Sequence, residues 1–253
     1  MFAMAIKPVV LSLALGVSFA SGLGAAQDKI TLRTGQVVEG EVKRFDRENQ
    51  RVFIAEARGE IPYPLVNISE IRLGPRKEIE EARAALAGGD AGRAVELVES
   101  LANSLVGLDD PVAAEAAGVL AEAYSRANQT GKANELFALI ERVYPTSIYR
   151  LQGRVIQARS QFRGGAPDAA LRTLGEVEKE IKHPAIPDAA SMQIMGDLLM
   201  TRAEILEAQG KKAEALADYL KVVVVYFQPE SRAQQAAAAA ERLRKSDPKL
   251  FVN

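Results

Sequence analysis

The sequence predicts an α+β protein that is mainly α. We expect about four antiparallel helix hairpins, stacked into an α-α superhelix, after a small β-barrel-like module. Three observations predict this class. Apolar and polar residues alternate between residues 28 and 74, as they do in short strands. Alanine becomes abundant from residue 75 onward, and one spacing of small residues then recurs four times. Hydrophobic residues make up 48% of the 253 residues, which is enough to form a core.

The first 26 residues have the composition of a secretory signal and are not expected to belong to the fold. Lys7 provides a positive start, residues 9–19 are apolar and uncharged, and small residues follow up to Ala26. The apolar run of about 12 residues is shorter than the ~20 that a spanning helix needs. We expect cleavage after Ala26, no membrane span in the mature chain, and a periplasmic or secreted location. Retention of residues 1–26 as an N-terminal anchor is the alternative.

Residues 27–75 are expected to form the small β module, with five short strands separated by tight turns. Pro62 and Pro64 interrupt the last but one of these runs. Because proline cannot donate to a ladder, we expect that strand to lie at an edge of the sheet. Five strands in so short a segment indicate a small curled sheet or barrel.

Residues 76–253 are expected to form a helical repeat domain, because one frame of residues recurs there. Two alanines flank a Gly or Asn, and a larger residue follows, at steps of seven, five and four residues. The instances are Ala82, Gly89, Ala94 and Val98; Ala121, Asn128, Ala133 and Phe137; Ala158, Gly165, Ala170 and Leu174; and Ala203, Gly210, Ala215 and Tyr219. Small residues let two helices approach closely, and the residue between them adopts the left-handed conformation that ends the first helix.

Other local patterns predict where helices lie. Asp110 followed by Pro111 is typical of an N-cap and a first-turn proline. The apolar run 222–227 is too short to span a membrane and is expected on a helix. The segment 229–245 is rich in helix formers and is expected to be a capping helix.

The residue content argues against an enzyme. The chain has no cysteine and one histidine, His183, which removes thiolate chemistry and nearly all imidazole chemistry. None of the common nucleotide-binding, hydrolase or metalloprotease motifs is present. We therefore expect no catalytic residue, no cofactor and no metal. With Lys plus Arg at 32 and Asp plus Glu at 33, the chain lacks a basic excess, and we expect no nucleic-acid partner.

The second frame resembles the tetratricopeptide repeat family. The matching residues are Leu120, Ala121, Tyr124, Ala133, Phe137, Ile140 and Pro145. Residues 210–226 resemble the second helix of the family's repeat. The other frames depart from it: Glu81, Gln157 and Arg202 replace the large residue before the first alanine, and the frames are 39, 37 and 45 residues apart.

The β module resembles Sm-like and related SH3-like small barrels in residues 30–46 and 66–74. RNA binding would require a positive module, but residues 27–75 contain eight basic and eight acidic residues. The resemblance therefore implies the fold and not RNA binding.

The tetratricopeptide resemblance implies a concave surface, formed by the first helix of each hairpin, that binds a partner protein or peptide. The implied contact positions are Glu115, Glu122, Ser125 and Arg126 in the second unit, and Asp197, Met200, Glu204 and Glu207 in the fourth. Each of them has an alternative interpretation as part of a solvated helix face. The acidity of Glu204 and Glu207 would favour a basic partner segment.

The leading functional expectation is a non-enzymatic protein–protein interaction scaffold of the bacterial cell envelope. The alternative is a structural module that self-assembles into a homo-oligomer through its β segment.

Overall fold

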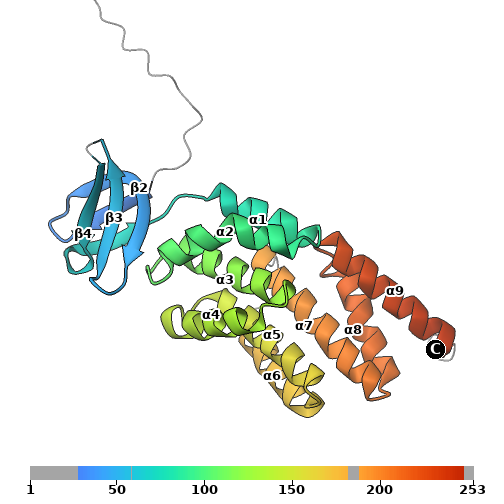
Figure 1. Cartoon of the computed structure of the whole chain (residues 1–253). Helices are drawn as coiled ribbons and strands as arrows, with labels where there is room; N and C mark the ends of the chain where they lie inside the picture. The colour runs from blue at the N-terminus through green and yellow to red at the C-terminus, as the bar shows by residue number, and fades with distance from the viewer. Residues whose placement is uncertain (1–27, 58, 182–187, 248–253) are drawn as a thin grey trace, which may run out of the picture.

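The fold is taken from a computed structural model of the chain, which describes residues 28–57, 59–181 and 188–247 (Figure 1). The predicted signal segment and His183 lie outside these residues. Within them, the chain forms a five-stranded antiparallel sheet followed by nine α-helices. The prediction of a mainly helical α+β protein is therefore confirmed.

The strands occur in the order β4-β3-β2-β1-β5 across the sheet. They are β1 (Asp28–Leu32), β2 (Val37–Asp46), β3 (Arg51–Glu56), β4 (Gly59–Pro64) and β5 (Ile68–Arg72), with a short 3-10 turn at Leu65–Asn67 before β5. The side chains of Ile30, Val52 and Ile54 are fully buried on one face. β4, which contains Pro62 and Pro64, lies at an edge, as the prolines predicted.

The described helices pair into four antiparallel hairpins and a last helix. The pairs are α1 (Lys77–Ala87) with α2 (Ala91–Leu105), α3 (Pro111–Arg126) with α4 (Thr130–Val143), α5 (Ile148–Arg163) with α6 (Pro167–Glu180), and α7 (Ala189–Ala208) with α8 (Lys212–Val224). The last helix, α9 (Glu230–Ser246), packs against α8, as expected of a capping helix. Figure 1 shows the sheet at one end of the molecule and α9 at the other, with the start of α9 close to α1.

The four predicted frames occupy the same place in each hairpin. The eight alanines of the frames are buried, one on each helix of a pair. The residue between the helices has a positive φ each time: 83° at Gly89, 60° at Asn128, 83° at Gly165 and 76° at Gly210. The spacing therefore marks a left-handed turn between two closely packed helices, as predicted.

The predicted helix boundaries are confirmed in one place and corrected in another. The Asp110 carboxylate caps α3 by accepting a hydrogen bond from Val112 N at 2.7 Å, and Pro111 occupies the first turn. The run 222–227 was expected to be helical throughout, but α8 ends at Val224. A proline disfavours helical backbone at the residue before it, here Gln228, so the helix has to end ahead of Pro229. No helix of the described residues is both long and apolar enough to cross a membrane.

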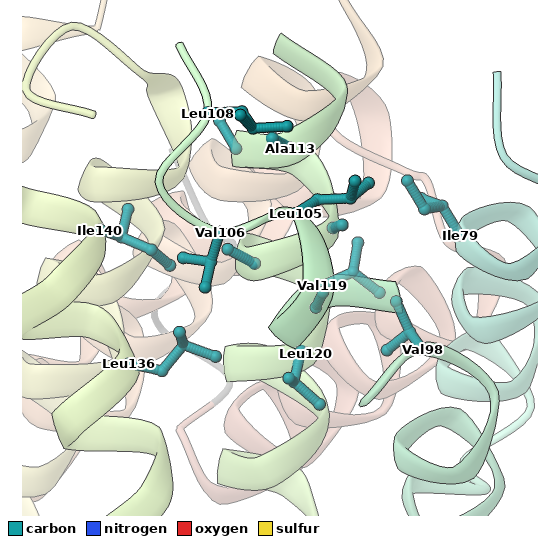
Figure 2. Close-up of a cluster of buried hydrophobic side chains, with 14 of the residues drawn as sticks. Ile79, Val98, Leu105, Val106, Leu108, Ala113, Val119, Leu120, Leu136 and Ile140 are labelled. Carbon is teal, nitrogen blue, oxygen red and sulfur yellow. The ribbon is translucent and has the colours of Figure 1, made fainter. Parts of the chain in front are cut away.

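Two hydrophobic clusters form the core. The first is continuous from the sheet through the first two hairpins, and Figure 2 shows side chains of α2, α3 and α4 that point toward one another within it, such as Val98, Leu120 and Ile140. The second extends from α5 to α9. The sheet is thus packed directly on the helices and is not a separately cored unit.

Candidate functional site

Two adjoining cavities lie between the first helices of the hairpins. The α1–α7 cavity, of about 450 Å³, is lined by Arg83, Leu86, Ala87, Glu122, Arg126, Ala189, Met192, Gln193, Gln228 and Pro229. The α5–α9 cavity, of about 220 Å³, is lined by Arg126, Arg159, Arg163, Asp197, Met200, Glu204, Pro229, Ser231, Arg232 and Gln235. Because they share Arg126 and Pro229, we treat the two cavities as one groove.

One position of the repeated frame lines the groove in every hairpin. It directly follows the first alanine and is occupied by Arg83, Glu122, Arg159 and Glu204. The first helices therefore present a row of charged side chains, with arginine in the first and third hairpins and glutamate in the second and fourth.

Glu122 connects three of these first helices. Its side chain is buried, with a residue exposure of 3%. The Oε2 atom accepts a hydrogen bond from Gln193 Nε2 of α7 at 2.7 Å and another from Gln152 Nε2 of α5. Arg126, one turn further along α3, forms an ion pair with the same carboxylate. Burial raises the pKa of the Glu122 carboxyl, and the nearby negative charge of Asp197 acts in the same direction.

Asp197 lies between two arginines in the α5–α9 cavity. Arg232 Nη2 is 3.0 Å from Asp197 Oδ1, and Arg159 Nη2 is 4.0 Å from the same oxygen. Arg159 also donates to Thr201 Oγ1 at 3.1 Å, and Arg232 Nη1 donates to Gln228 O at 2.6 Å. The Asp197 carboxylate thus joins α7 to α9 through Arg232, while Arg159 of α5 lies at the limit of ion-pair distance.

Five of the eight predicted contact residues line the groove: Glu122, Arg126, Asp197, Met200 and Glu204. Of these, Met200 is buried and Glu204 is exposed. The structure therefore brings together predicted residues from the second and fourth units.

The other three lie beside the groove and do not line it. Glu115 pairs with Arg83 Nη2 at 2.7 Å, and burial raises the pKa of its carboxyl. Ser125 is half-buried on α3. Glu207 accepts from Arg242 Nη2 at 2.7 Å and from the Tyr219 hydroxyl at 3.1 Å, so its charge is neutralised by α9.

The groove contains arginines that sequence reasoning missed: Arg83, Arg159, Arg163 and Arg232. In the α5–α9 cavity, four arginines face two carboxylates, those of Asp197 and Glu204. Burial raises the pKa of the Glu204 carboxyl, and the nearby Arg159 and Arg163, which the prediction of a basic partner segment did not include, act in the opposite direction. Applying the frame position to all four units would have identified Arg83 and Arg159.

The groove presents guanidinium and carboxylate groups beside apolar side chains. Among the described residues, no three carboxylate or imidazole groups come together in a way that could hold a metal ion. A larger cavity of about 700 Å³ lies among the loops before α3 and α5, but it is lined by these two boundaries between hairpins and not by the repeated frame. In comparisons with known proteins, no protein-family model, no curated protein and no solved structure matches this chain.

Proposed function

We propose that this chain is a non-enzymatic interaction protein of the bacterial cell envelope, which binds a segment of a partner protein in the groove. The observation that carries the proposal is the origin of the groove wall. Each of the four hairpins contributes residues of its first helix to this wall, and α9 contributes residues as well. A continuous surface built from one helix of each repeat is how stacked helix pairs bind their partners.

We further propose that the hairpins form a tetratricopeptide-like superhelix. Its support is the frame that the second unit shares with that family, together with the buried alanines and left-handed turns at equivalent places in all four hairpins. For the β module, the proposal extends only to an Sm-like or SH3-like fold, on the residues 30–46 and 66–74.

The proposed export rests on the composition of residues 1–26. N-terminal sequencing of the protein isolated from its native cells tests it. We expect the mature chain to begin at Gln27 and to be recovered from the periplasmic or secreted fraction. A chain that still begins at Met1 and sediments with membranes would show that the segment is an anchor.

Partner binding is tested by photo-crosslinking in cells. A photoreactive amino acid placed at Met192 or Gln235 reports on the groove, because these residues line its two cavities. The same amino acid at Ala217, which is exposed on α8, is the control. We expect one common partner from both groove positions and none from Ala217. Equal adducts from all three positions would contradict binding in the groove.

Self-assembly through the β module is less well supported. Leu65 N donates to Gln50 O at 2.7 Å, so alternate residues of β4 direct their N–H groups toward β3. Pro62 and Pro64 occupy the positions between these residues, and their nitrogens face away from β3. Because proline has no N–H group, the outer edge of β4 lacks two donors. Such an edge is a poor template for another strand. Light scattering should give the mass of a monomer; a stable ring would favour self-assembly instead.

A further inference from the structure

We propose that the groove selects an acidic segment of its partner: an extended stretch of chain with an apolar side chain for the α1–α7 cavity and a carboxylate for Arg159 and Arg163 in the α5–α9 cavity. This inference rests on the proposed function, since it specifies what the groove binds.

The first argument is the charge that the groove leaves unbalanced. The buried Glu122 carboxylate is already engaged by Arg126, Gln152 and Gln193. Asp197 is engaged by Arg232 at 3.0 Å, which leaves Arg159 with a distant ion pair at 4.0 Å.

Arg163 adds a second unbalanced charge to this wall. It is exposed at the end of α5, and its side chain makes no hydrogen bond or ion pair to another described residue. Of the four arginines in the α5–α9 cavity, Arg126 is paired with Glu122 and Arg232 with Asp197. Arg159 and Arg163 then face the single carboxylate of Glu204, so the cavity keeps a net positive charge that attracts an anion.

The second argument is that Arg159 is held in place before a partner binds. Arg159 is half-buried and donates to Thr201 Oγ1 at 3.1 Å. Arg159 and Arg163 lie four residues apart on α5, so their side chains are neighbours on one face of that helix. Guanidinium groups that are already oriented lose little side-chain entropy when they bind a carboxylate, and each offers two parallel donors.

The third argument identifies the anion as part of a protein segment. The α1–α7 cavity adds the apolar surface of Leu86, Ala87, Met192 and Pro229 next to the arginines. A small anion would contact the α5–α9 cavity alone, whereas two or three extended residues, which span roughly 7–10 Å, would reach both cavities. Neither cavity is lined by an aromatic residue on which a base could stack, which disfavours single-stranded nucleic acid.

Binding of labelled peptide pools to the purified full-length protein tests the inference. Three fluorescein-labelled octapeptide pools share the same Leu and Val positions. At the remaining positions the first pool carries Asp and Glu, the second carries Lys and Arg, and the third carries Ser and Gln. Fluorescence anisotropy is expected to show that the acidic pool binds at least about tenfold more tightly than either other pool, and that added salt weakens it.

Matched variants locate the effect. Arg163→Glu is expected to lower the affinity for the acidic pool by about tenfold, because it replaces an attraction with a repulsion. Arg172→Glu, on the exposed side of α6 and outside the groove, makes the same charge change and should leave the affinity unaltered. Arg159→Gln should also weaken binding. Circular dichroism melting of each variant confirms that it is folded.

The outcomes separate this inference from the proposed function. Equal affinity for the three pools, or an unchanged affinity in Arg163→Glu, overturns the selection of acidic segments, while crosslinks from Met192 and Gln235 would still support binding in the groove. Inorganic phosphate that binds in the groove and resists displacement by the acidic pool also overturns it, in favour of a small-anion site.

Discussion

Arg76 Nη2 lies 2.5 Å from Asp28 Oδ2, and this ion pair joins the first residue of β1 to the residue that precedes α1. Asp28 has an exposure of 2%. Its two carboxylate oxygens also accept hydrogen bonds from Val42 N and Gly74 N, each at 2.7 Å. A single buried carboxylate therefore holds β1, β2 and the connection to the helices in one arrangement.

Replacement of Asp28 by Ala should lower the free energy of unfolding by about 3–5 kcal/mol, because it leaves two buried N–H groups without a partner and the half-buried Arg76 guanidinium with only its hydrogen bond to Gly74 O. Urea denaturation followed by circular dichroism measures this loss. Glu39→Ala is the control, since Glu39 pairs with Lys29 at 2.6 Å in the same sheet but both side chains are about half exposed. It should cost less than about 1 kcal/mol. Similar losses in the two variants would contradict the role of Asp28.

Asp110 should contribute more than an ordinary helix cap. Its Oδ1 atom caps α3, and its Oδ2 atom accepts from Leu73 N, at the end of the β module, at 3.0 Å. Asp90 caps α2 by accepting from Arg93 N at 2.9 Å. Asp90→Ala should therefore cost about 1 kcal/mol. Asp110→Ala should cost about 2–3 kcal/mol, because the half-buried N–H group of Leu73 also loses its partner.

Hydrogen exchange distinguishes the two effects of Asp110. The Leu73 amide should exchange faster in Asp110→Ala than in the unmodified protein and should be unaffected in Asp90→Ala. Unchanged exchange at Leu73 in both variants would mean that Asp110 acts only as a cap.

The turn glycines should be required for their backbone conformation and not for space. Gly165 has a φ of 83°, and no atom lies within 4 Å of where a Cβ would be placed; Gly175, in the middle of α6, has equally open surroundings but no positive φ. Gly165→Ala should cost about 1–2 kcal/mol. Gly175→Ala should gain up to about 1 kcal/mol, because alanine favours helix. Thermal or urea denaturation compares them, and a loss of stability in both would show that side-chain space, not φ, is limiting.

The hairpins could be predicted from the sequence because their determinants are local. A turn that needs a positive φ and two helices that need small residues impose a spacing that can be recognised along the chain, as at Ala158, Gly165 and Ala170. The end of α8 was missed because four consecutive valines, 222–225, are equally compatible with a helix and with the segment that follows it.

The groove could be predicted only in part. The position after the first alanine is local, and it would have identified Arg159 from the same frame that places Glu122 and Glu204 in the groove. The pairing of Asp197 with Arg232 joins α7 to α9 across 35 residues, and no spacing in the chain predicts it. The net charge of the groove depends on such tertiary contacts, and counting the acidic residues of one helix does not determine it.

The buried Glu122 carboxylate should make stability depend on pH in a direction that can be measured. Burial raises its pKa in the folded protein above the value in the unfolded chain. Between those two pKa values the folded state binds more protons than the unfolded state, so the free energy of unfolding decreases as the pH rises through this window and then levels off. Glu122→Gln removes the titrating group and keeps an acceptor for Gln152 and Gln193. Relative to this variant, the unmodified protein should become less stable as the pH is raised.

Glu180 is the control for Glu122, with the opposite sign. Arg150 donates a hydrogen bond to its carboxylate and holds the pKa of Glu180 below its ordinary value. The stability that Glu180 contributes is present at pH values above its pKa in the unfolded chain. It is lost as the pH falls through its pKa in the folded protein. Relative to Glu180→Gln, the unmodified protein should therefore become more stable as the pH is raised. Urea denaturation of the three proteins between about pH 2.5 and pH 8 measures both slopes, because the Glu180 window lies below the ordinary pKa of a glutamate and the Glu122 window lies above it. If the two differences change with pH in the same direction, the charged carboxylate of Glu122 is not disfavoured by its burial between α3, α5 and α7.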